Sequence, residues 1–103
     1  MLTIEEIARR LAPVFEASGV TKAVLFGSFA KGTATADSDV DIVVETEAHV
    51  RGWDFGGICF DAAECLQKRV DLIPRQDIIP GGQIDLEVAK AGRVIFEKRS
   101  VVA

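Results

Sequence analysis

One stretch of the sequence, residues 27–44, constrains the whole chain. It begins with Gly27-Ser28 directly after an apolar run, and ten residues further on it reaches Asp39-Val40-Asp41, which opens a second apolar run. In a β-strand alternate side chains share a face, so Asp39 and Asp41 are predicted to point the same way, with Cα atoms about 6.5–7 Å apart. Two converging carboxylates predict a bound hard cation, because such ions prefer oxygen ligands.

The turn before these acids has the properties of a phosphate site. Gly27 has no Cβ, so a phosphate can approach its backbone closely. The Ser28 hydroxyl and the N–H groups of the helical turn that follows can donate hydrogen bonds to phosphate oxygens. Lys31 lies one helical turn beyond Ser28 and can add a positive charge. The sequence therefore predicts a triphosphate-binding turn formed by Gly27, Ser28 and Lys31.

A third acid, Asp71, lies between Val70 and Leu72 in another short apolar run. If that strand neighbours the strand of Asp41, Asp71 completes a three-carboxylate cluster. Mg²⁺ is usually held by a few carboxylates together with substrate phosphates. Two such ions can clamp the attacking and leaving oxygens of an in-line displacement.

Periodicity and turn residues divide the chain into alternating helices and strands. Thr3 and Glu6 form a predicted capping box, Pro13 is expected to kink or end the regular part of the first helix, and Gly19 to stop it. Asp54 is the predicted cap of the next long helix. The predicted helices are 3–18, 28–31, 54–66 and 84–91, and the predicted strands are 21–26, 40–45, 70–73 and 93–98, with a polar loop at 32–38.

Composition limits the class of protein. A chain of 103 residues with 49% hydrophobic residues fits one α/β domain, 1–103, around a single core. Its formal charge of −4 makes direct nucleic-acid binding unexpected. No apolar run approaches the ~20 residues that span a bilayer, and no secretory signal opens the chain. Cys59 and Cys65 fit neither a redox pair nor a zinc site, so we expect a cytoplasmic protein with reduced thiols.

Together these residues resemble the signature of the DNA polymerase β-type nucleotidyltransferase superfamily: Gly27-Ser28, a ten-residue gap, Asp39-Val40-Asp41, and a later strand acid, Asp71. The short length is similar to its minimal nucleotidyltransferase (MNT) branch. The likeness covers nearly the whole chain. One departure is that members often carry arginine near the positions of Phe29 and Lys31, and a lysine lacks the bidentate fork of arginine.

The resemblance implies a fold, a reaction and a site. The fold is α+β, a mixed and mainly antiparallel sheet with helices packed on it. The reaction is attack of an acceptor hydroxyl on the α-phosphorus of ATP or another NTP. Gly27 and Ser28 would hold the triphosphate, Asp39, Asp41 and Asp71 would bind Mg²⁺, and Asp71 would help to activate the acceptor.

The resemblance also implies a partner. MNT proteins are similar to the antitoxin half of toxin–antitoxin modules whose toxin is a helical HEPN protein, and AMP transfer onto a toxin tyrosine is the leading hypothesis. This chain contains no tyrosine, so such an acceptor is not its own. Two alternatives stay open: a non-catalytic subunit that neutralises a partner by covering its surface, and a homodimeric nucleotidyltransferase acting on a small molecule.

Several other side chains are interpreted as structural. His49 stands in a polar loop without a Cys or His neighbour and is predicted to be a surface residue. For Trp53 and Phe55, packing at a helix start is favoured over an adenine-stacking platform. Lys68, Arg69 and Arg75 flank the third predicted strand and are expected to be solvated charges.

Overall fold

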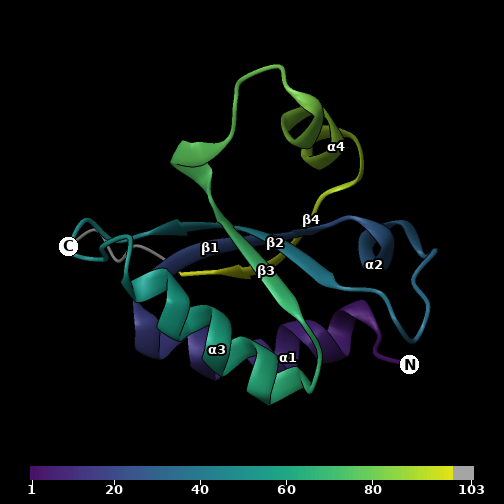
Figure 1. Ribbon diagram of the computed structural model, residues 1–103, viewed down its shortest axis with the longest axis horizontal. Coiled ribbons are helices and arrows are strands. Elements are labelled where there is room, and N and C mark those ends of the chain that lie inside the picture. Colours follow the sequence, from purple (N-terminus) through teal and green to yellow (C-terminus); the bar gives the residue numbers. More distant parts are fainter. Residues whose placement is uncertain (99–103) are drawn as a thin grey trace.

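The computed structural model describes residues 1–98 as a four-stranded sheet with helices on both sides (Figure 1). Residues 99–103 of the predicted domain lie outside this range. The helices are α1 (Ile4–Ser18), α2 (Ser28–Lys31), α3 (Asp54–Leu66) and α4 (Gln83–Ala91), with a 3-10 turn η1 (Arg75–Asp77). The strands are β1 (Val20–Phe26), β2 (Val40–Thr46), β3 (Val70–Pro74) and β4 (Arg93–Glu97).

The sheet has the strand order β3-β2-β1-β4. β1 runs antiparallel to both β2 and β4, whereas β2 and β3 are parallel. The prediction of a mixed, mainly antiparallel sheet is therefore confirmed. The parallel pair brings the third strand beside the second, which is the condition on which a role for Asp71 depended.

The two faces of the sheet are covered unequally. α1 and α3 lie side by side against one face, whereas α4 and η1 lie on the other (Figure 1). No residue of α4 is fully buried, so that second face is only partly covered. The core lies between the sheet and the α1–α3 layer. Its members include Ile7, Leu11, Phe15, Leu25, Ile42, Val44, Ile58, Ala62 and Leu66.

The start of α1 is held by the capping box that the sequence predicts. The Thr3 N–H donates to Glu6 Oε1 at 3.2 Å, and the Glu6 N–H donates to Thr3 Oγ1 at 3.1 Å. Pro13 does not end the helix, which continues to Ser18. Leu11 and Phe15, on either side of Pro13, are completely buried, and their packing outweighs the local preference of proline. The helix then stops at Gly19, which is left-handed as predicted.

The start of α3 differs from the prediction. Trp53 occupies the capping position and its side chain makes no cap, while Asp54 is the first helical residue. The Asp54 carboxylate instead accepts a hydrogen bond from the Arg51 N–H at 2.7 Å, closing the preceding turn. Carboxylates in a first helical turn are favoured by the helix dipole, which explains the position of Asp54 without a cap. The predicted apolar face is confirmed: Ile58 and Leu66 are buried.

Smaller differences concern the ends of strands. β3 includes Pro74, which the sequence places after the strand, and a proline is tolerated there because β3 lies at the edge of the sheet. Between residues 1 and 98, none of the helices has the length and apolar character needed to cross a membrane.

Candidate active site

The turn after β1 is built around a glycine. Gly27 has φ +75° and ψ −156°, and a Cβ placed on it would lie 2.5 Å from Asp41 Oδ2. Both facts exclude other residue types, because L side chains rarely adopt a positive φ and the space is already filled. The first helical turn follows at once: the Lys31 N–H donates to the Gly27 carbonyl at 3.1 Å.

Asp41 lies between this turn and Asp71. In the sheet register Asp41 is opposite Phe26 of β1 on one side and opposite Asp71 of β3 on the other. Residues at the same level of adjacent strands project from the same face, about 4.8 Å apart. The carboxylates of Asp41 and Asp71 are therefore neighbours beside the Gly27 turn.

Negative charge is concentrated around Asp41 and changes its pKa. Burial, followed by repulsion from Asp71, Asp39 and Glu87, raises the pKa of Asp41 to about 6. Binding of a cation would stabilise the ionised form of such a carboxyl group, because the cation offsets the repulsion that raises its pKa.

Asp39 lies just before β2 and is linked to Asp71 through an arginine. Arg69 Nε is 4.0 Å from Asp39 Oδ2 and 4.0 Å from Asp71 Oδ1. The pairing of β2 with β3 begins beside this group, where the Val40 N–H donates to the Arg69 carbonyl at 3.0 Å. The Arg69 side chain is 77% exposed, a solvated charge as predicted, and its guanidinium also lies near two of the three predicted metal ligands.

A divalent cation of this kind requires oxygen donors grouped around one point. Within residues 1–98, no three His, Cys, Asp or Glu side chains are grouped as the ligands of one metal ion. Asp41 and Asp71 supply the hard oxygen donors that Mg²⁺ prefers, and their mutual repulsion favours a cation between them. The donor chemistry fits Mg²⁺. The joint role of Asp39, Asp41 and Asp71 in binding it stays a prediction.

Lys31, predicted to contact the triphosphate, is paired with an acid that the sequence did not single out. Its ammonium donates to Glu87 Oε1 on α4, 56 positions along the chain. Glu87 also contributes to the raised pKa of Asp41. No motif marks Glu87 in the sequence: it is one acid among several on a helix, and only the placement of α4 over the sheet brings it to the site.

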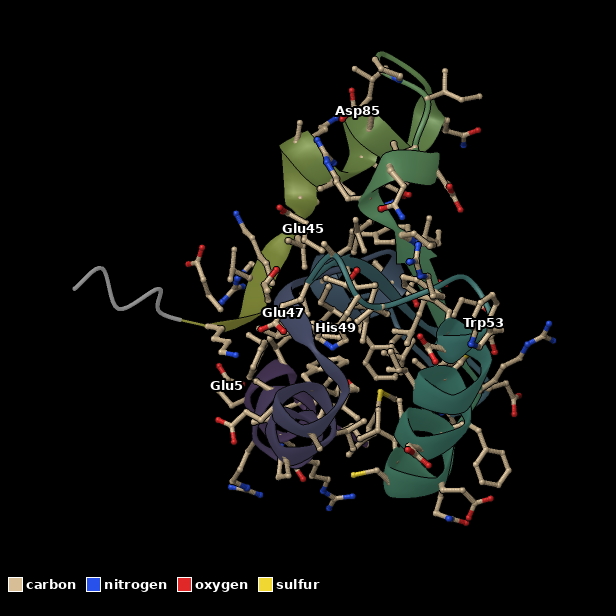
Figure 2. All side chains as sticks on the ribbon, turned by 90° about the vertical axis from the view of Figure 1, so that its left-hand side faces the viewer. Glu5, Glu45, Glu47, His49, Trp53 and Asp85 are labelled. Atoms are coloured by element: carbon tan, nitrogen blue, oxygen red, sulfur yellow. The ribbon has the colours of Figure 1, made fainter. Side chains whose placement is uncertain are left out.

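The remaining candidates divide into confirmed and wrong predictions. His49 lies beside Glu47, with its side chain 71% exposed, and is a surface residue as predicted (Figure 2). Trp53 is 80% exposed at the start of α3, so its predicted packing is wrong, whereas Phe55 packs against the core (Figure 2). Trp53 precedes the first turn of the helix and never reaches the buried face.

The other two flanking cations, like Arg69, have partners in the structure. Lys68 Nζ donates to the Ala36 carbonyl at 2.7 Å and lies 5.7 Å from the centre of the Phe29 ring. This contact fastens the loop between α2 and β2. Arg75 is 3.5 Å from Asp85 Oδ1, an ion pair that joins η1 to α4.

Comparison with known proteins gives concordant results. A family model described as "Nucleotidyltransferase domain" matches residues 3–99. A Methanocaldococcus jannaschii protein named "Putative protein adenylyltransferase" is 33% identical over 79 residues, which cover 77% of this chain and 85% of that protein. A solved structure described as "Structure of putative minimal nucleotidyltransferase" is 25% identical, with a TM-score of 0.74 over 89% of this chain and 95% of the other.

A further solved structure is the MNT antitoxin in complex with a tri-AMPylated HEPN toxin of Shewanella oneidensis. It is 15% identical, with a TM-score of 0.70, and the match covers 93% of this chain and 74% of that chain. At this identity the likeness bears on the fold alone.

The fold shared with the structure of a putative minimal nucleotidyltransferase is that of a nucleotide-transferring enzyme. Because the family model spans nearly the whole chain, and a relative is 33% identical over most of it, the chain belongs to the nucleotidyltransferase domain family.

Proposed function

We propose that this nucleotidyltransferase transfers AMP from ATP to a hydroxyl group of a partner protein. The observation that carries the proposal is the register pairing of Asp41 with Asp71 beside Gly27. Two carboxylates and a phosphate-sized turn on one face are what phosphoryl chemistry requires, because positioning and charge stabilisation supply most of its catalysis. The relative from Methanocaldococcus jannaschii supports protein as the class of acceptor.

In the proposed reaction, the acceptor oxygen forms a bond to the α-phosphorus of ATP. The bond from this phosphorus to the oxygen that bridges it to the β-phosphate breaks, and pyrophosphate leaves. The acceptor hydroxyl gives up its proton to a carboxylate, and we assign this general-base role to Asp71. Asp71 is suited to it because it is half-buried on β3 and lies beside Asp41.

The triphosphate would lie on the turn after β1. Gly27 leaves room for a phosphate, the Ser28 hydroxyl donates to it, and Lys31 adds a positive charge. Asp41 and Asp71, with Asp39, are the residues that would hold Mg²⁺, which when bound neutralises charge on the phosphates. Neighbouring carboxylates already repel one another at Asp41, so binding of a cation is favoured there.

The proposed partner is a HEPN-type toxin, with the present chain as its antitoxin. The supporting fact is the fold shared with the MNT antitoxin of Shewanella oneidensis. Because this chain contains no tyrosine, a tyrosine acceptor would belong to the partner. The free thiols of Cys59 and Cys65 agree with the cytoplasmic location that we propose for the pair.

Radiolabel transfer tests the proposal. The full chain is incubated with ATP labelled at the α-phosphate, Mg²⁺ and the purified HEPN-type protein encoded by the neighbouring gene. Label is expected on the partner, and none when Asp41→Asn replaces the wild type. A partner that forms the complex but stays unlabelled would overturn the proposed reaction.

One observation favours a second function, binding without catalysis. Arg69 Nε lies 4.0 Å from carboxylate oxygens of Asp39 and Asp71, two of the three acids proposed to hold the metal ion. The double variant Asp39→Ala, Asp41→Ala distinguishes catalysis from binding without catalysis. If the double variant still neutralises its partner, binding suffices; if it forms the complex without neutralising it, the enzyme is required.

A further inference from the structure

Glu87 links α4 to the turn that is proposed to bind the triphosphate. It lies on α4, which packs on β1, and its carboxylate accepts a hydrogen bond from the ammonium of Lys31 on α2. The Lys31 side chain is 45% exposed and that of Glu87 is 28% exposed. The pair therefore lies at the surface, where a dissolved anion can reach the lysine.

The charge of Glu87 also acts on the centre of the site. It adds to the repulsion that Asp41 experiences from Asp71 and Asp39. Glu87 is thus a fourth acid in the neighbourhood of the paired carboxylates, and its counter-ion is the lysine that follows the Gly27-Ser28 turn. A triphosphate bound at that turn would compete with Glu87 for Lys31.

We propose that Glu87 is a positioning residue that sets the affinity of the site for triphosphate by holding Lys31. This inference rests on the proposed function, since it takes the Gly27-Ser28 turn as the triphosphate site. Nucleotide binding transfers Lys31 from the Glu87 carboxylate to a phosphate oxygen. Glu87 touches no reacting atom, so it changes how tightly the nucleotide is held and leaves the rate of the chemical step unaltered.

The direct test is the affinity of the full chain for a fluorescent, non-hydrolysable ATP analogue, measured by anisotropy with and without Mg²⁺. Glu87→Gln keeps the shape of the side chain and removes its charge. Because a surface ion pair of this kind is worth up to about 1 kcal/mol, the variant is expected to bind about two- to five-fold more tightly. The matched control is Glu64→Gln on α3, which removes one charge on the opposite face of the sheet and is expected to leave the affinity unchanged.

A double-mutant cycle shows whether Glu87 acts through Lys31. Lys31→Gln alone is expected to weaken binding, and adding Glu87→Gln to it is expected to restore nothing. Inorganic tripolyphosphate, used as a competitor, should give the same ratio between wild type and Glu87→Gln, because the effect lies in the phosphate part of the ligand. If the Glu87→Gln protein does not fold, Glu87→Asp, which shortens the reach to Lys31, is expected to tighten binding in the same direction.

The outcomes separate this inference from the proposed function. A wild type that binds no nucleotide would overturn both. A wild type that binds, with Glu87→Gln equal or weaker, would overturn the inference alone. A gain from Glu87→Gln that persists in the absence of Lys31 would show direct repulsion and overturn the role of the lysine.

Discussion

Gly27 lies against Asp41 so closely that a Cβ on the glycine would be 2.5 Å from Asp41 Oδ2. The sheet register explains this contact, because Phe26, immediately before the glycine, is opposite Asp41 in the sheet. The turn proposed to hold phosphate and the acid proposed to hold the metal are therefore one structural unit.

Replacing Gly27 by alanine should disrupt this unit. The new methyl group would meet a carboxylate oxygen and the backbone would keep an unfavourable φ of +75°. We expect the free energy of unfolding to fall by about 1–3 kcal/mol and AMP transfer to be lost. Urea unfolding and the radiolabel assay measure the two effects.

A glycine-to-alanine change elsewhere is the control for this prediction. Gly57 lies in α3 with open space around its Cα, so Gly57→Ala should stabilise the protein by up to about 1 kcal/mol and leave transfer unchanged. A Gly27→Ala protein as stable and as active as the wild type would show that the contact with Asp41 has no role.

The sequence predicted these elements because their signals are local. Period-two and period-3.6 apolar patterns, together with Thr3 and Gly19 at the ends of α1, place nearly every helix and strand within a few residues. The pairing of Asp41 with Asp71 was foreseen only as a condition, because strand order depends on long-range packing that spacing does not encode.

The site contacts that sequence reasoning missed are non-local. Glu87 reaches Lys31 from 56 positions away, and Arg69 reaches Asp39 only because β3 lies beside β2. Trp53 shows the opposite error, since a large apolar residue next to a helix start was expected to pack and is 80% exposed. Trp53 precedes the first turn of α3, so its side chain does not lie on the buried face of the helix.

The stability of the protein should depend on pH through Asp41. Its pKa is raised to about 6 in the folded state, so between about pH 4 and pH 6 the folded protein binds more protons at this group than the unfolded chain does. Raising the pH through that range therefore lowers the free energy of unfolding of the wild type. Asp41→Asn removes this cost, and the variant should gain more stability relative to wild type at pH 7.5 than at pH 4.5.

Thermal unfolding of both proteins in EDTA at the two pH values measures this difference. EDTA is needed because a bound cation would lower the pKa of Asp41 and hide the effect. Asp61→Asn, which removes an exposed acid on α3, is the control for the loss of one negative charge outside the site. An Asp41→Asn advantage that is equal at both pH values would contradict the proposed source of the shift.

Two aromatic residues should differ sharply in their contribution to stability. Phe15 is completely buried and its ring lies 5.5 Å from that of Phe96, so Phe15→Ala should lower the free energy of unfolding by about 3–5 kcal/mol. Trp53→Ala removes a larger but exposed side chain and should change it by less than about 0.5 kcal/mol. Urea titration of the two variants provides the comparison, and a large loss from Trp53→Ala would show that its ring is covered in solution.

Mg²⁺ should stabilise the protein through the paired aspartates. At ten times its dissociation constant a ligand of the folded state adds about 1.4 kcal/mol, which EDTA should reverse. Asp41→Asn and Asp71→Asn should each abolish the gain, because each removes one of two neighbouring oxygen donors. Arg69→Gln should increase it, since Arg69 Nε lies 4.0 Å from acidic oxygens of both Asp39 and Asp71 and competes with the metal for them.

Differential scanning fluorimetry across a Mg²⁺ titration measures these shifts, with Glu64→Gln as the variant expected to match wild type. The sign of the Arg69→Gln effect is the sharpest part of the prediction. If Arg69 only neutralises the acids, its removal increases the repulsion between Asp39 and Asp71 and lowers the stability of the metal-free protein. The affinity for Mg²⁺ then rises. A variant that binds Mg²⁺ more weakly than wild type would mean that Arg69 holds the carboxylates in place for the metal, and the competition argument would be wrong.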